Sequence, residues 1–170
     1  MPEPHSPVLD LTRELIAVPS VTPDDGSGQA PVRVLLEQLG FRIEDMTEEG
    51  VANLYARLGE GSPVLAFGGH TDVVPTGDEG KWSHPPFSPT VDGGRLYGRG
   101  VADMKGAVAA FTVAVERFLA RNPEPKGSIV FLITGDEEGP AVHGTRAMVD
   151  RMQARGETMD YCLIGEPSGQ

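Results

Sequence analysis

The stretch VLAFGGHTD, Val64 to Asp72, decides how this chain is organised. An apolar run of this length is typical of a buried strand, and Gly68 and Gly69 permit a sharp turn with close backbone approach at its end. His70 and Asp72 follow, and an imidazole two residues before a carboxylate suits a metal ligand and the group that orients it. In extended backbone both side chains point to the same side. The alternative is a plain Gly-Gly-His turn in which Asp72 is a cap.

The same pattern, an apolar run followed by glycine and then by a possible metal ligand, occurs twice more along the chain. The apolar run Ser128–Thr134 is followed by Gly135 and the acidic segment 136–138, and the run Asp160–Ile164 is followed by Gly165 and Glu166. Open α/β sheets bind their ligands beyond the carboxyl ends of the strands. We therefore expect an α/β fold in which these imidazole and carboxylate groups converge.

The composition limits the classes of function. With 170 residues, 39% of them hydrophobic, the chain is long enough for one globular domain with a core. A formal net charge of -11 argues against binding a nucleic acid or an anionic membrane through a basic face. The sequence has no signal peptide or transmembrane stretch, and its single cysteine cannot form an internal disulfide, so we expect a cytoplasmic protein. Cys162 is expected to be a small buried apolar side chain.

Helical patterns lie on both sides of a loop near the start of the chain. Ser6 can cap an amphipathic helix whose first residue is Pro7, and this helix ends before the loop. The segment PSVTPDDGSGQ, residues 19–29, is rich in Pro, Gly, Asp and Ser, so we expect a loop whose two aspartates are turn residues unless another group recruits them. A second helix is expected from about residue 30 to residue 39, where the following glycine stops it.

Alternating polar and apolar residues predict strands around two turns. One pair of strands flanks the turn at residues 48–50, and Asp-Gly-Gly at 92–94 indicates a hairpin. Segment 73–89 is rich in proline and glycine, so we expect a loop in which His84 is exposed or packed and is not a ligand. A long apolar segment through Leu119 begins after GRGVADMKG, residues 98–106.

Asp103 lies at the entrance to this apolar segment and has two possible roles. It could be an N-cap whose carboxylate accepts N–H bonds from the first helical turn. It could instead bridge two divalent cations about 3.5–4 Å apart, as in two-metal hydrolases. The set His70, Asp103, Glu138 and Glu166 favours the metal site, because imidazole and oxygen ligands suit zinc and its neighbours.

Glu137 and Glu138 are adjacent and need not do the same job. In an extended segment their side chains point to opposite sides, so one could bind a metal while the other takes a proton from water. The alternative is a solvated acidic turn after the strand.

Four blocks together resemble the zinc aminoacylase and carboxypeptidase family. These are GGHTDVVP (68–75), LYGRGVADMKG (96–106), ITGDEEGPAVHGT (133–145) and DYCLIGEPS (160–168). They follow the family's order and span most of the chain. The resemblance implies a zinc-peptidase-like fold, with a mixed, mostly parallel sheet flanked by helices and incomplete at its C-terminal end. It also implies hydrolysis of an amide bond with two divalent metal ions, zinc first and cobalt second.

The resemblance implies a role for each site residue. His70 would bind the first metal, Glu166 would complete that metal's set, Asp103 would bridge both metals and Glu138 would bind the second. Asp72 would orient His70.

By the same resemblance, Glu137 would be the general base and acid, and the peptide bond after Asp103 would be cis. Within the family, the loop at 19–29 and the last two blocks favour an enzyme that cleaves N-succinyl-LL-diaminopimelate to succinate and LL-diaminopimelate in lysine biosynthesis. The alternatives are a deacetylase of acetylornithine, a dipeptidase, or a non-catalytic metal-binding module. The presence of Glu137 argues against the last, because a metal binder has no need of a non-ligand carboxylate there.

The resemblance further implies that residues 1–170 are the N-terminal portion of a catalytic domain. Members of the family continue into an inserted lid and dimerisation domain, then return to supply one more histidine ligand. His5, His84 and His143 lack a matching motif, so we expect them to be structural or exposed. We expect a homodimer formed through the absent domain, an exposed apolar sheet edge that favours association, and little turnover by this chain alone.

Overall fold

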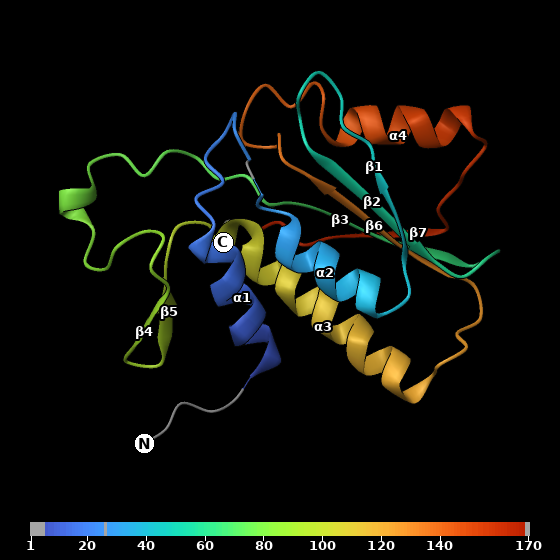
Figure 1. The fold of residues 1–170 in the computed structure, drawn as a ribbon, viewed down its shortest axis with the longest axis horizontal. Helices are drawn as coiled ribbons and strands as arrows, with labels where there is room; N and C mark the ends of the chain where they lie inside the picture. The colour runs from blue at the N-terminus through green and yellow to red at the C-terminus, as the bar shows by residue number, and fades with distance from the viewer. Residues whose placement is uncertain (1–5, 26, 169–170) are drawn as a thin grey trace.

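A five-stranded mixed sheet forms the centre of the computed structural model, which describes residues 6–25 and 27–168 (Figure 1). In spatial order its strands are β1 (Arg42–Asp45), β2 (Asn53–Leu58), β6 (Ser128–Thr134), β3 (Val64–His70) and β7 (Tyr161–Ile164). The pairs β1–β2 and β2–β6 are antiparallel, whereas β6–β3 and β3–β7 are parallel. The predicted mixed sheet flanked by helices is confirmed. Its parallel part consists of the three strands whose ends carry the predicted site residues.

Helices cover both faces of this sheet (Figure 1). The helices α1 (Pro7–Ala17), α2 (Ala30–Gln38) and α3 (Gly106–Arg121) lie on one face, and α4 (Thr145–Ala154) lies on the other. The predicted cap of α1 is confirmed, because the Ser6 hydroxyl accepts the Leu9 N–H at 3.4 Å. Helix α4, which was not predicted, buries Met148 and Met152 against the sheet.

Aromatic packing fills the larger of the two cores, between the sheet and α1–α3. The ring of Phe67 stacks on Phe111 with centroids 4.3 Å apart and meets the edge of Phe131 at 5.9 Å. Phe41 approaches Phe131 edge-on at 5.6 Å. These geometries are favourable for aromatic rings, so the core holds β3 and β6 firmly side by side.

Strand β3 continues through both glycines and ends at His70, so the predicted sharp turn at Gly68 and Gly69 is wrong. Gly68 pairs with Leu132 and His70 pairs with Thr134 in the parallel ladder. The glycines are required by close packing instead. A Cβ on Gly68 would lie 2.7 Å from the side chain of Ile164, and one on Gly69 would lie 2.9 Å from Met104. His70 is therefore held by the sheet itself.

A short π-type turn, η2 (Val101–Lys105), presents Asp103 before α3 begins. Asp103 has extended backbone angles (φ -128°, ψ 97°), and α3 begins without a side-chain cap, so the N-cap alternative is wrong. The cis peptide bond between Asp103 and Met104 that the resemblance implied is confirmed. The buried Lys105 fixes the turn to α1 by donating to the carbonyls of Leu15 and Val18 at 2.8 and 2.9 Å.

The predicted hairpin is confirmed as β4 (Thr90–Asp92) and β5 (Arg95–Tyr97). The loop before it contains one short 3-10 turn, η1 (Glu79–Lys81), and His84 from this loop packs on Tyr97 with ring centroids 4.4 Å apart. His143 is half-buried, and His5 lies outside the described residues. None of the described helices is both long and apolar enough to cross a bilayer.

Strand β7 lies at the edge of the sheet and pairs with β3 as its one partner among the described strands. Tyr161, Leu163 and Ile164 are 66%, 51% and 54% exposed. Cys162 is also exposed, so its predicted burial is wrong. The reason is that no described element covers this strand, although its apolar composition is typical of a buried one.

We expect this edge to make the 170-residue chain self-associate, because a free apolar strand offers unpaired backbone groups to a second molecule. Leu163→Lys places a charge on the edge and should reduce association. Val34→Lys is the matched control, because Val34 has the same 51% exposed fraction but lies on α2. Sedimentation velocity over a range of concentrations measures the effect. A monomer at every concentration would contradict the prediction.

Candidate metal centre

The His70 imidazole is fully buried at the end of β3, and its two nitrogens have different surroundings. Nδ1 lies 2.9 Å from the backbone carbonyl oxygen of Asp72. A carbonyl oxygen only accepts hydrogen bonds, so Nδ1 carries the hydrogen and donates. Nε2 is therefore the nitrogen available to a metal.

The Asp72 carboxylate is also fully buried and connects two segments of the chain. It accepts the backbone N–H of Glu137 at 3.2 Å and that of Glu138 at 3.0 Å. Its Oδ1 lies 3.5 Å from the Nδ1 atom of His70. Asp72 thus fixes the turn after β6 beside the end of β3.

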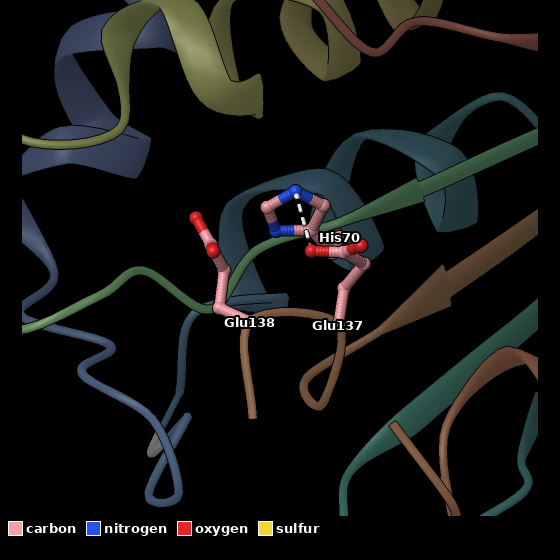
Figure 2. Close-up of side chains that lie close together, drawn as sticks. All are labelled: His70, Glu137 and Glu138. Atoms are coloured by element: carbon pink, nitrogen blue, oxygen red, sulfur yellow. Dashed lines mark ion pairs between the residues drawn. The ribbon is translucent and has the colours of Figure 1, made fainter. Parts of the chain in front are cut away.

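Acidic side chains from three segments surround His70 Nε2. The nearest oxygen of Asp103 lies at 3.1 Å, that of Glu166 at 3.4 Å and that of Glu137 at 3.8 Å. Figure 2 shows Glu137 and Glu138 rising from the turn after β6 on either side of the imidazole. The structure thus brings all the residues singled out in the sequence to one place, although they are spread over residues 70–166.

Two groups of residues could each hold a metal ion, because within each group the donor atoms all lie within 4.8 Å of one another. One group is His70, Glu137 and Glu138, and the other is His70, Asp103 and Glu166. The second group is the ligand set that the resemblance implied for a first metal. One imidazole with several carboxylates suits zinc or a neighbouring divalent metal, so the residues present fit such ions.

Cavities beside the cluster leave room for a ligand. Asp103 and Glu138 line one cavity of about 410 Å³. Glu137 and Glu166 line another of about 330 Å³, together with Gly68 and Gly69. The candidate donors are therefore accessible to a small molecule, while His70 itself stays buried.

The crowding of charge shifts the pKa values of the site. Burial lowers the pKa of His70, but the hydrogen bonds to Asp72 and the negative charges of Asp72 and Glu166 outweigh it and raise that pKa to about 9. Burial, with the charge of Asp103, raises the pKa of Glu138, and the same two causes raise the pKa of Glu166. The carboxylates thus repel one another and favour any cation that enters, either a proton on His70 or a metal ion.

Two buried residues beside the cluster, Asp25 and Thr71, were missed. The Asp25 backbone carbonyl accepts the Gly28 N–H at 2.9 Å, as in a turn, but its side chain is recruited elsewhere: Asp25 is only 4% exposed and accepts a hydrogen bond from the Thr71 hydroxyl at 2.9 Å. Thr71 offered a signal. Because His70 and Asp72 point to one side of extended backbone, Thr71 points to the other, where a buried hydroxyl requires a partner. Nothing in the sequence indicated that Asp25 is this partner.

The chain is similar to known proteins over most of its length. It is 56% identical over 165 residues to the succinyl-diaminopimelate desuccinylase of Halorhodospira halophila, and 55% identical over 163 residues to that of Bordetella parapertussis. These alignments cover 97% and 96% of this chain but only 44% and 43% of the relatives. The chain therefore spans less than half the length of the curated relatives that it matches.

Solved structures share the fold. Human carnosine dipeptidase 1 superimposes with a TM-score of 0.82 at 27% sequence identity, over 95% of this chain and 38% of the dipeptidase. Residues 66–170, which carry every acidic and imidazole group of the cluster, match the peptidase family M20/M25/M40. This chain belongs to peptidase family M20/M25/M40.

Proposed function

We propose that this chain carries the metal centre of an amide hydrolase that cleaves N-succinyl-LL-diaminopimelate into succinate and LL-diaminopimelate, a step of lysine biosynthesis. The observation that carries the proposal is the convergence of Asp103, Glu137 and Glu166 on the Nε2 atom of His70. The names of the two desuccinylase relatives support this choice of substrate.

The proposal assigns two divalent cations, zinc or cobalt, to this cluster. His70, Asp103 and Glu166, whose donor atoms lie together, would hold the first. Asp103 with Glu138, which line one cavity, would hold the second. When bound, the cations polarise the amide carbonyl and lower the pKa of water, so that a nucleophile is available at neutral pH. Asp72 holds the His70 ring with Nδ1 protonated, which keeps Nε2 free for the first cation.

Glu137 is the proposed general base and acid. Its side chain is 49% exposed, so it can reach a water in the cavity, while its backbone N–H is fixed by the buried Asp72. The Glu137 carboxylate takes a proton from the attacking water, a C–O bond forms at the amide carbon, and the C–N bond then breaks. Glu137 returns the proton to the leaving amine nitrogen.

We further propose that residues 1–170 are the N-terminal portion of the catalytic domain of a longer enzyme. That enzyme would be a cytoplasmic homodimer joined through residues outside this chain. The short alignment coverage of the relatives and the uncovered strand β7 support a larger assembly.

The substrate assignment predicts a preference between two amides. The full-length enzyme should hydrolyse N-succinyl-LL-diaminopimelate faster than N-acetylornithine, as measured by release of the free amine. The 170-residue chain alone should show little or no turnover, because the family resemblance assigns one more histidine ligand of the second cation to residues outside this chain. Faster hydrolysis of N-acetylornithine would overturn the substrate assignment. Turnover by the 170-residue chain alone at the full-length rate would overturn its assignment as one portion of a longer catalytic domain.

The role of Glu137 predicts that Glu137→Gln removes activity but not metal. The glutamine side chain cannot take a proton from water, so kcat should fall by roughly 10²–10⁴-fold while the enzyme keeps its metal content. Glu138→Gln should instead lower the metal content, measured by elemental analysis after dialysis. Glu124→Gln, at an exposed position away from the site, is the control and should change neither quantity. Full activity of the Glu137 variant would show that another group moves the proton.

The His70 pKa of about 9 predicts that metal binding depends on pH. A metal binds the neutral ring, so below this pKa a proton must leave first. The affinity for cobalt should rise about tenfold per pH unit from neutral pH towards 9 and then level off. Competition with a chelator at several pH values measures this slope. A flat profile over the same range would contradict the prediction.

A further inference from the structure

The loop at residues 19–25 lies against the end of β3, immediately behind the metal centre. Its backbone pairs with the segment after β3, because Thr22 N–H donates to the Val73 carbonyl at 3.0 Å and Val73 N–H donates to the Ser20 carbonyl at 2.9 Å. The Ser20 hydroxyl donates to the Thr71 carbonyl at 2.6 Å. The loop therefore fixes the chain on both sides of Asp72.

Asp25 completes this contact from the side opposite the metal centre. Its Oδ1 accepts the Thr71 hydroxyl at 2.9 Å, and both residues are buried. The Thr71 N–H is held by the Thr134 carbonyl of β6 at 3.0 Å. The N–H, the carbonyl and the hydroxyl of Thr71 are thus all hydrogen-bonded. Thr71 lies between His70 and Asp72 in the chain.

Asp25 also packs against the segment that leads to Glu137. A Cβ on Gly135 would lie only 2.6 Å from the Asp25 Cβ and 2.8 Å from its Cγ, so Gly135 is pressed directly against this side chain. Gly135 follows Thr134, the last residue of β6, and directly precedes the acidic segment 136–138. Asp25 thus touches two of the segments that present the candidate donors, the end of β3 and the start of the turn after β6.

Burial of this carboxyl is costly for stability. The second oxygen of Asp25, Oδ2, has no hydrogen-bond partner among residues 6–25 and 27–168, and burial raises the pKa of the carboxyl to about 6. A buried, half-paired carboxyl destabilises a fold, and a turn residue exposed to water would avoid that loss. Costly polar groups of this kind are found where they serve a site.

We propose that Asp25 is a positioning residue for the metal centre. Through Thr71 it fixes the backbone that carries His70 and Asp72, and through Gly135 it fixes the start of the turn that carries Glu137. This inference rests on the proposed metal-dependent function, and it adds a residue that touches neither metal nor substrate.

The experiment measures cobalt binding to the full-length enzyme and the visible absorption spectrum of the bound cobalt, which reports ligand geometry. Asp25→Ala and the isosteric Thr71→Val each remove the same hydrogen bond. Each should weaken cobalt binding about tenfold and change the spectrum, and the double variant should be no worse than either single one. Asp25→Asn and Thr71→Ser are the matched controls, because each keeps the acceptor or the hydroxyl, and both should bind cobalt like the wild type.

Three results would overturn the proposal. The first is a folded Asp25→Ala enzyme with wild-type cobalt affinity and spectrum whose sole change is a lower free energy of unfolding, which would make Asp25 merely structural. The second is additive losses in the double variant, and the third is loss of cobalt binding in Asp25→Asn. If Asp25→Ala does not fold, Thr71→Val decides alone, because it conserves shape. Failure of the wild-type enzyme to bind cobalt would instead refute the proposed function itself.

Discussion

The buried carboxylate of Asp72 is the interaction on which the centre depends. It receives the backbone N–H groups of Glu137 and Glu138, and the carbonyl of the same residue holds the His70 ring. One residue thereby links the end of β3 with the turn after β6. The linkage is possible because β3 and β6 are parallel neighbours whose carboxyl ends lie at the same edge of the sheet.

Around this link the site gathers much more negative charge than its single imidazole can balance. Carboxylates that repel one another destabilise the fold, and the hydrogen bonds of His70 to Asp72, with the negative charges of Asp72 and Glu166, raise the pKa of the imidazole. A divalent cation would relieve this repulsion. The same crowding that costs stability therefore prepares the site for metals, and the surrounding packing must hold the acidic groups in place.

That packing comes from backbone contacts as much as from side chains. Gly68 and Gly69 let Ile164 and Met104 approach β3 so closely that β7 and the turn carrying Asp103 reach the same edge as His70. The Lys105 ammonium ties that turn to the end of α1. The loop after α1 in turn packs behind Thr71, so the first helix and its loop support the centre from outside.

The sequence by itself determined the strands, most of the helices and the identity of the acidic and imidazole groups, because periodicity and strand ends are local features. Four motifs in order were sufficient to indicate the family. Tertiary structure alone decided three points. The glycines of β3 allow close packing and make no turn, Cys162 lies exposed on an edge strand, and Asp25 is a buried partner of Thr71. Each depends on what lies across space from the residue, and a local pattern carries no information about a neighbour that is distant along the chain.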